Sequence, residues 1–330
     1  MAKPVCWVVT DGRAGIESQA LGLAEAVAEI RPMEIVVKRI GVRSPWRELP
    51  WRAWGEALGR LSSASDRLDP PFPELWIGCG RLSVPFAVSI KKRAPETFTV
   101  QLQNPRAPSA LFDLIIPPEH DRLSGDNVFS IIGSPNRTNV RSVGAVNAPA
   151  RNLRKIAVLI GGPNRVFKYS AAGAGAFIER LGALADKGDE LAITTSRRTP
   201  HGLRPLLRDL ARRDGVTLWI AGLDSRETNP YPAMLGGCRA VIVTEDSVNM
   251  AVEAAATGKP VYISPLERKF LAPAMKFDAF HESLRRRGVA RKFEGEIADW
   301  SYELLDETRR AAEEVIRRMR SREVSPKRVR

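Results

Sequence analysis

The sequence predicts an α/β protein with two Rossmann-like domains facing a cleft and a C-terminal helix that crosses back to the first domain. Strand-like apolar runs alternate with helical patterns along the chain, which is typical of parallel sheets. The alternation restarts at Lys155, and 330 residues exceed the usual size of a single core. We therefore expect an N-terminal domain at 1–150, a C-terminal domain at 151–299, and a long helix with a basic tail at 300–330.

Hydrophobic periodicity predicts the elements of the first domain. Strands are expected at 5–10, 35–40, 75–77, 97–102 and 112–116, with helices over 16–30 and from 81 to about 92. The stretch 43–73 holds three of the seven Trp and several Pro, which indicates helical turns that pack on the sheet or rim the cleft. The weakly patterned stretch 133–154 is the expected linker.

The same pattern predicts the second domain. Strands are expected at 155–160, 190–194, 217–220, 241–244 and 261–263, with helices at 171–184 and 202–213, a short one ending at Gly258, and a long one at 300–320. A helix after the second sheet is expected to brace the first domain.

The composition excludes several classes of protein. No apolar run approaches the roughly 20 residues of a membrane span, and the apolar start is too short for a signal peptide. The three Cys have no metal or redox spacing, which indicates buried, reduced thiols in a cytoplasmic protein. A net charge of +13 raises the question of nucleic acid, but there is no recognition motif and no basic stripe with interleaved aromatics.

Basic residues concentrate at the C-terminus. They are Arg317, Arg318, Arg320, Arg322, Lys327, Arg328 and Arg330. Such a tail suits peripheral contact with anionic lipid at the inner face of a membrane, or an acidic partner. The alternative is a solvated helix end.

Polar side chains gather where the 241–244 strand gives way to a helix: Glu245, Asp246, Ser247 and Asn249, with Glu253 further along. Ligands bind at the carboxyl ends of strands in open parallel sheets. Carboxylates accept hydrogen bonds from sugar or ribose hydroxyls, and helix-start N–H groups hold phosphate. Seven residues separate Glu245 from Glu253, about two helical turns, so we expect both carboxylates to face one ligand. The alternative is a capped helix whose acids complement its dipole.

Two further strand ends suit a diphosphate. Gly161 and Gly162 permit close backbone approach to a phosphate, with Arg165 or Lys168 nearby to neutralise it. Ser196, Arg197 and Arg198 follow the next strand, where cations at a helix start would oppose its dipole and so favour a ligand. The alternatives are a tight turn for the glycines and a solvated helix start for the arginines.

The first domain offers candidate proton acceptors. Asp11 lies between a strand and a helix, where it would orient an acceptor hydroxyl, act as a base or cap the helix. His120 is flanked by two acids at a strand end, which suits either a general base or a structurally held loop residue. His201 and His281 read as surface residues, and no group of His, Cys and acids has metal spacing.

Motifs spread over residues 5–263 resemble the mitochondrial-fission ELM-like family. They include Asp11-Gly-Arg-Ala-Gly15, Ile77-Gly-Cys-Gly-Arg81, Pro118-Glu-His-Asp-Arg-Leu123, Leu159-Ile-Gly-Gly162, Thr194-Thr-Ser-Arg-Arg-Thr-Pro200, Asn229-Pro-Tyr231 and Thr244-Glu-Asp-Ser-Val-Asn-Met250. The resemblance implies a glycosyltransferase-B-like fold, distantly similar to lipid-A-disaccharide synthase and UDP-N-acetylglucosamine 2-epimerase. The Glu245–Glu253 pair also resembles a two-glutamate motif of such transferases, which implies that Glu245 contacts the donor sugar and Glu253 the ribose.

Together these features predict a glycosyltransferase-like protein that needs no metal. We expect a UDP-linked sugar donor in the interdomain cleft, an acceptor on the first domain, and Asp11, His120 and Glu245 as catalytic candidates. The alternatives are a nucleotide-sugar epimerase of the same fold and a non-catalytic adaptor that recruits a membrane-remodelling partner. The sugar, the acceptor, the stereochemical course and the oligomeric state stay open.

Overall fold

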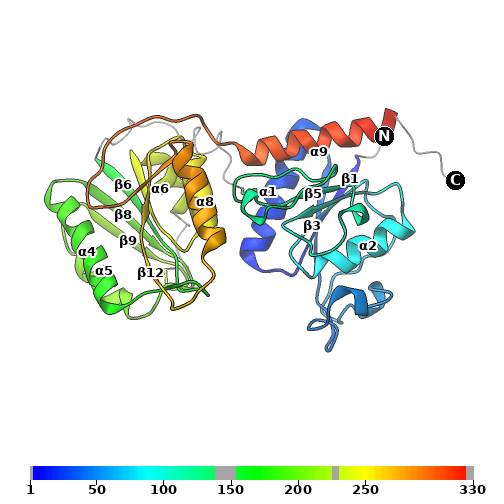
Figure 1. The fold of residues 1–330 in the computed structure, drawn as a ribbon, viewed down its shortest axis with the longest axis horizontal. Helices are drawn as coiled ribbons and strands as arrows, with labels where there is room; N and C mark the ends of the chain where they lie inside the picture. Colours follow the sequence, from blue (N-terminus) through cyan, green and yellow to red (C-terminus); the bar gives the residue numbers. More distant parts are fainter. Residues whose placement is uncertain (1–2, 138–153, 225–229, 325–330) are drawn as a thin grey trace. The chain divides into compact units, whose positions relative to one another are not determined.

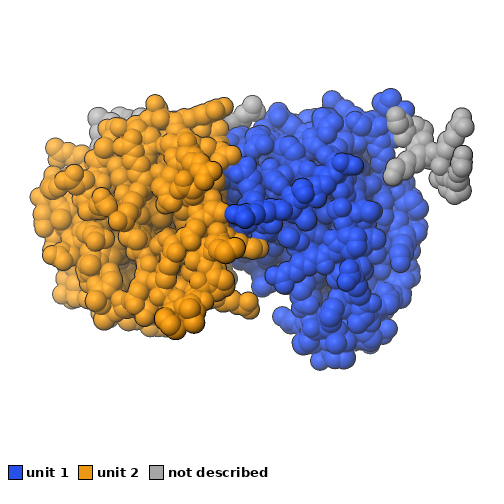
Figure 2. All heavy atoms as spheres, viewed as in Figure 1, with its two compact units in different colours: residues 1–137, 306–330 blue, residues 138–305 orange. Residues whose placement is uncertain are grey.

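The chain folds into two compact units. A computed structural model describes residues 3–137, 154–224 and 230–324. Unit 1 comprises Met1–Arg137 with Asp306–Arg330, and unit 2 comprises Thr138–Leu305 (Figure 2). Most of the expected linker, residue Asn229 and the tail cations Lys327, Arg328 and Arg330 lie outside the described residues.

Unit 1 is built on a five-stranded, all-parallel sheet in the order β2-β1-β3-β4-β5 (Figure 1). Its strands are β1 (Val5–Thr10), β2 (Glu34–Arg39), β3 (Leu75–Cys79), β4 (Phe98–Leu102) and β5 (Leu114–Ile116). Helix α1 (Ala14–Ile30) joins β1 to β2, and α2 (Ser83–Arg93) joins β3 to β4. From β1 the chain runs to β2 on one side, and it then crosses back to β3 on the other side of β1. The carboxyl ends of β1 and β3 therefore form a topological switch point.

The two faces of this sheet bury alternate side chains of each strand. In β1, Cys6 and Val8 belong to the core beneath α1, whereas Trp7 and Val9 belong to the core beneath α2. The predicted helical turns are the 3-10 helices η1 (Trp51–Ala53) and η2 (Leu58–Arg60). Trp54, between them, is 1% exposed in the α2-side core, so this segment packs on the sheet as one alternative predicted.

The C-terminal helix completes unit 1, as the sequence predicted. The apolar side chains of α9 (Glu307–Val324) share a core with those of α1. This core includes Ala20, Leu23, Ala24 and Val27 of α1 and Ala311, Ala312, Val315, Ile316 and Met319 of α9. At its start, Glu307 is buried and accepts a 2.7 Å hydrogen bond from the backbone N–H of Ile132.

The expected start of this helix at Trp300 was wrong. The helix begins at Glu307 because the side chain of Asp306 accepts a 3.0 Å hydrogen bond from the N–H of Arg309, as a capping residue does. Trp300 instead packs in unit 2, with its ring 5.0 Å from that of Tyr262.

Unit 2 is built on a six-stranded, all-parallel sheet in the order β13-β11-β10-β6-β8-β9. Its strands are β6 (Lys155–Ile160), β8 (Glu190–Thr195), β9 (Val216–Ile220), β10 (Ala240–Thr244), β11 (Val261–Ser264) and β13 (Ala290–Lys292). Numbered along the chain, this is the 3-2-1-4-5-6 order of the dinucleotide-binding Rossmann fold. The switch point therefore lies between the ends of β6 and β10.

The described residues of unit 2 form five α-helices: α4 (Ala171–Asp186), α5 (Leu203–Leu210), α6 (Tyr231–Gly237), α7 (Val248–Ala255) and α8 (Met275–Arg286). Helices α4 and α5 pack on one face of the sheet, and α8 lies on the opposite side (Figure 1). A short antiparallel pair, β7 (Phe167–Lys168) with β12 (Glu267–Arg268), joins two loops at the carboxyl edge. The expected strands are all present, but the sequence did not predict α6, α8, β13 or the β7–β12 pair.

The contact between α1 and the segment that leads out of β5 yields a first prediction. A Cβ on Gly22 of α1 would lie 2.3 Å from the backbone carbonyl oxygen of Asn136, a distance that backbone cannot accommodate. Gly22→Ala should therefore destabilise unit 1 by about 1–3 kcal/mol through overpacking. Urea unfolding measures the change.

The matched control is Gly175→Ala on α4, where an added Cβ meets nothing within 4 Å. Alanine there should stabilise the protein by roughly 0.5–1 kcal/mol through helix propensity alone. Equal effects of the two substitutions would contradict the close approach at Gly22.

Candidate functional site

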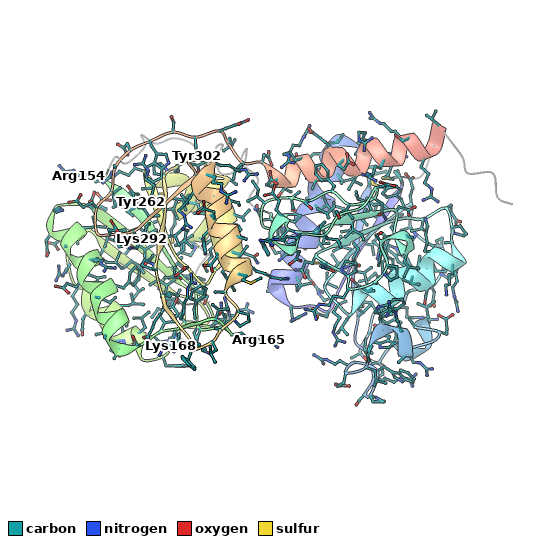
Figure 3. All side chains as sticks on the ribbon, in the orientation of Figure 1. Arg154, Arg165, Lys168, Tyr262, Lys292 and Tyr302 are labelled. Atoms are coloured by element: carbon teal, nitrogen blue, oxygen red, sulfur yellow. The ribbon has the colours of Figure 1, made fainter. Side chains whose placement is uncertain are left out.

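The carboxyl edge of the unit 2 sheet gathers most of the predicted ligand-binding residues. Gly161 and Gly162 follow β6, and Glu245 and Asp246 follow β10, so these four residues border the switch point. Figure 3 shows Arg165 and Lys168 at this end of unit 2 and Arg154, which precedes β6, at the other. The sheet order thus brings together residues that lie more than 80 positions apart in sequence.

Asp246 is the central carboxylate of this edge. Its side chain accepts hydrogen bonds from Gly162 N (2.8 Å), Thr244 Oγ1 (2.8 Å) and Tyr169 Oη (3.0 Å). Arg198 Nη2 adds a longer ionic contact at 3.5 Å. Burial raises the pKa of Asp246, and these donors oppose the rise because they favour the carboxylate. Asp246 therefore joins three loops, and its ligand-binding role stays a prediction.

The two glycines are required by the packing of these loops. A Cβ on Gly161 would lie 2.1 Å from Asp246 Oδ2, and one on Gly162 would lie 2.2 Å from the carbonyl oxygen of Arg198. Their N–H groups are also engaged, that of Gly161 by Thr244 Oγ1 and that of Gly162 by Asp246. This geometry supports a tight structural turn at Gly161 and Gly162, which was the alternative to a phosphate-binding loop.

Cationic side chains lie beside this packed centre. Arg197 is exposed beyond β8, and the side chain of Arg198 is 54% exposed. Ser196 Oγ accepts a 3.2 Å hydrogen bond from Arg198 N and so helps to shape the turn. Lys168 forms an ion pair with Glu267 across β7 and β12. The two arginines are therefore the side chains best suited to meet an anion from solvent.

Glu245 is held in place by three elements. Its Oε2 accepts a 3.0 Å hydrogen bond from Leu266 N, and Arg268 Nη2 lies 3.5 Å from Oε1. Its carbonyl oxygen lies 2.9 Å from His281 Nε2 of α8. The side chain is 15% exposed, so it retains some access to solvent.

The prediction that His281 is a surface residue was wrong. His281 is 3% exposed, and burial lowers its pKa. Its Nδ1 has no hydrogen-bond partner among the described residues. A neutral imidazole that donates from Nε2 to the carbonyl of Glu245 fits both observations. The hydrophobic pattern did not predict α8, which carries His281 into the interior of unit 2.

The expected helical spacing of Glu245 and Glu253 was also wrong. Helix α7 begins at Val248, after the N-cap Ser247, whose Oγ accepts a hydrogen bond from Met250 N. Glu245 therefore lies in the turn before the helix. Ser247 has the capping role given as the alternative, and Asn249 lies in the first turn.

Glu253 has a partner on a different helix. The hydroxyl of Tyr231, the first residue of α6, donates a hydrogen bond to Glu253 Oε2. Burial raises the pKa of Glu253 to about 7. The group therefore changes its protonation state near neutral pH, and its contact with a ribose stays a prediction.

The catalytic candidates of unit 1 lie on separate strand ends. Asp11 follows β1 and forms a 2.7 Å ion pair with Arg13, while Arg13 itself is the N-cap of α1. His120 lies in a 3-10 turn, Glu119–Asp121, after β5 and is half-buried. Strands β3 and β4 separate β1 from β5, a spacing of about 14 Å at 4.8 Å per strand. The sheet therefore does not bring Asp11 and His120 together.

Unit 1 has a buried polar cluster that the sequence analysis missed. Gln103 Nε2 donates a 2.9 Å hydrogen bond to Gln19 Oε1, and Cys79 Sγ lies 3.7 Å from the same oxygen. Gln101 and Ser83 lie close by, 3.2 Å apart, and both are buried. Amide side chains from α1, from β4 and from the residue after β4 thus meet near the carboxyl ends of β3 and β4.

Several cations of the C-terminal tail are neutralised within unit 1. Arg317 and Arg318 both pair with Glu314, at 2.7 and 2.5 Å. Arg322 lies 3.5 Å from Asp113 and donates to the carbonyl of Thr97. The described part of the tail therefore supports the solvated helix end more than a lipid-binding segment.

Two searches of the described residues bear on the kind of site. No group of three or more His, Cys, Asp and Glu side chains within them is arranged to hold a metal ion. None of the helices in the described ranges combines the length and the apolar character needed to cross a bilayer.

Two units of parallel strands with Rossmann-like order define a glycosyltransferase-B-like fold. Two solved structures show this likeness, each at 11% sequence identity. One is provisionally assigned as a UDP-N-acetylglucosamine 2-epimerase of Listeria monocytogenes (TM-score 0.56, 96% of this chain and 88% of that chain). The other is the complex of S. aureus MnaA with UDP (TM-score 0.54, 96% and 89%). At this identity the likeness establishes the fold alone.

The sequence pattern of the family described as Mitochondrial fission ELM1 matches residues 14–319, and the chain belongs to this family. It is 30% identical to the Mitochondrial fission protein ELM1 of Arabidopsis thaliana, over 81% of this chain and 69% of that protein. It is 26% identical to the uncharacterized protein RP120 of Rickettsia prowazekii (strain Madrid E), over 93% and 96%. The family and the fold expected from the sequence motifs are thereby confirmed.

Because the pKa of Glu253 is raised, we expect the free energy of unfolding to depend on pH. Between about pH 4.5, its ordinary value, and about pH 7, the unfolded chain releases the proton while the folded chain keeps it. The free energy of unfolding should therefore fall as pH rises through this window, by about 1–3 kcal/mol from this group. Glu253→Gln should lose that much less than the wild type between pH 4.5 and pH 8, as measured by urea midpoints.

Glu179→Gln, on an exposed position of α4, is the matched control and should keep the wild-type slope. Parallel pH profiles for the wild type and Glu253→Gln would show that Glu253 titrates as an ordinary carboxylate.

Proposed function

We propose that this protein is a glycosyltransferase-like enzyme that binds a nucleotide-sugar donor on unit 2 and an acceptor on unit 1. The observation that carries the proposal is the switch point of unit 2. There, a 3-2-1-4-5-6 sheet presents Glu245 and two exposed arginines at its carboxyl edge, around the buried Asp246. Sheets of this order bind nucleotides at that position. The UDP in the S. aureus complex of like fold supports the same ligand class.

Each part of the edge has a chemical role in this proposal. Arg197 and Arg198 neutralise the diphosphate, which is also the leaving group of glycosyl transfer. Glu245 accepts hydrogen bonds from sugar hydroxyls, and its restraint by Leu266 N and Arg268 presets its orientation. Glu253 accepts from the ribose, with Tyr231 holding its other side.

The proposed acceptor side rests on unit 1. A base must remove the proton of the attacking hydroxyl, and Asp11 and His120 are the candidates. Because they lie on strand ends about 14 Å apart, only one of them can serve a given acceptor atom. Asp11 lies at the switch point of its sheet, where ligands bind, and is the stronger candidate.

Donor binding is tested by titration of UDP into the protein. The double substitution Arg197→Gln and Arg198→Gln should weaken UDP about ten- to a hundredfold, because a charge-assisted hydrogen bond contributes about 1.5–3 kcal/mol. Arg208→Gln, an exposed arginine on α5, is the matched control and should leave the affinity unchanged. If the wild type bound neither UDP nor any other nucleotide, the result would favour a non-catalytic adaptor.

The ribose contact is tested with two ligands. At pH 8, where Glu253 is mostly ionised, Glu253→Gln should weaken UDP about tenfold and leave inorganic pyrophosphate unaffected, since pyrophosphate has no ribose. Calorimetry of both ligands with both proteins gives the comparison. An equal change for the two ligands would remove Glu253 from a ribose contact.

A nucleotide-sugar epimerase is the second candidate. One of the two structures of like fold has the name of a UDP-N-acetylglucosamine 2-epimerase, and the other is a complex with UDP. The two activities differ in their products. A transferase releases UDP only when an acceptor is present, whereas an epimerase converts the sugar nucleotide without one. Incubation with UDP-N-acetylglucosamine alone, followed by chromatography, separates them.

A further inference from the structure

The loop between β12 and α8, together with the first residue of α8, exposes three large apolar side chains. Phe270 is 92% exposed, Leu271 86% and Met275 74%. Single apolar side chains are common on protein surfaces, but these three lie within six residues. Elsewhere in the described parts of the chain, exposed large hydrophobic residues occur singly.

The base of this loop is well packed. Val166, Phe167 and Ala274 form a buried cluster against which Leu266, Ala272 and Phe277 pack. The rings of Phe167 and Phe277 lie 5.1 Å apart, edge to face. The N–H of Lys269 donates a 2.7 Å hydrogen bond to the carbonyl of Val166. Since its inward side chains are buried, the loop holds Phe270 and Leu271 outward at a fixed tip.

The loop is also positively charged. From Lys269 to Phe277 the sequence has two lysines and no acid, and both lysines are exposed. The flanking acids are already paired, Glu267 with Lys168 and Asp278 with Arg268. The exposed surface of the tip therefore combines apolar side chains with positive charge.

We propose that residues 269–276 dock on the surface of an anionic membrane. Phe270 and Leu271 enter the boundary between headgroups and acyl chains, while the exposed Lys269 contacts the anionic headgroups. Peripheral segments bind membranes by these two contributions together. A peptide partner would need a groove on this protein to bind in, whereas an exposed apolar tip can enter a bilayer directly. This proposal does not depend on nucleotide binding.

Sedimentation with lipid vesicles tests the proposal on the full-length protein. Wild type should bind vesicles of phosphatidylcholine mixed with phosphatidylglycerol, and increasing salt should weaken the binding. The double substitution Phe270→Ser and Leu271→Ser should weaken it at least tenfold, because two large apolar side chains lose their burial. Val324→Ser removes an equally exposed apolar side chain (84%) from α9 and should have no effect.

A fluorescent probe tests insertion directly. The three native cysteines are buried, so an environment-sensitive dye will react selectively with Leu271→Cys. Its emission should shift to the blue when anionic vesicles are added, because the tip enters an apolar region.

Four outcomes would overturn the proposal. They are no sedimentation of the wild type, equal binding by the double variant, no spectral shift at position 271, and binding lost on deletion of 325–330 but kept by the double variant. Self-association that the double variant abolishes, without vesicle binding, would assign the tip to a protein interface instead.

Discussion

The candidate site depends on the hydrogen bonds and the ionic contact that the buried carboxylate of Asp246 accepts. This carboxylate is buried at the end of β10 and accepts from the backbone of the β6 loop, from the hydroxyls of Thr244 and Tyr169, and from Arg198. A buried carboxylate without such donors would cost several kcal/mol, so these loops must close around it. The absence of a Cβ at Gly161 and Gly162 follows from this closure, since any side chain there would collide with Asp246 or the β8 loop.

This arrangement also separates structural from available groups at the sheet edge. Hydrogen bonds that hold the loops use the N–H groups of both glycines and the whole carboxylate of Asp246. The groups that remain for a ligand include the side chain of Glu245, which is partly exposed, the two arginines after β8, and the exposed Arg165. Apart from Arg198, whose guanidinium also contacts Asp246, the groups that hold the loops and the groups available to a ligand therefore belong to different residues.

The hydrophobic pattern predicted the fold class and ten of the strands of the two large sheets, but it did not predict β13 or the contacts within the site. Runs of β-branched residues predicted the strands, because strands of a buried parallel sheet are apolar on both faces. The restart of the pattern at Lys155 indicated the second sheet. Helices α6 and α8 were not predicted, so the sequence did not indicate that Tyr231 contacts Glu253 or that His281 contacts Glu245. The pairing of Arg317 and Arg318 could have been: Glu314 lies three and four residues before them, the spacing at which helical side chains meet.

The return of α9 to unit 1 means that the first half of the chain cannot finish its core while it is being made. The contact of Arg31 with Glu323 spans 292 positions. At roughly 5–20 residues per second, α1 would leave the ribosome about 15–60 s before the helix that covers it. During synthesis the apolar stripe of α1 would therefore be open to chaperones and to other nascent chains, and a ribosome that stalled before Asp306 would release a protein with that stripe uncovered.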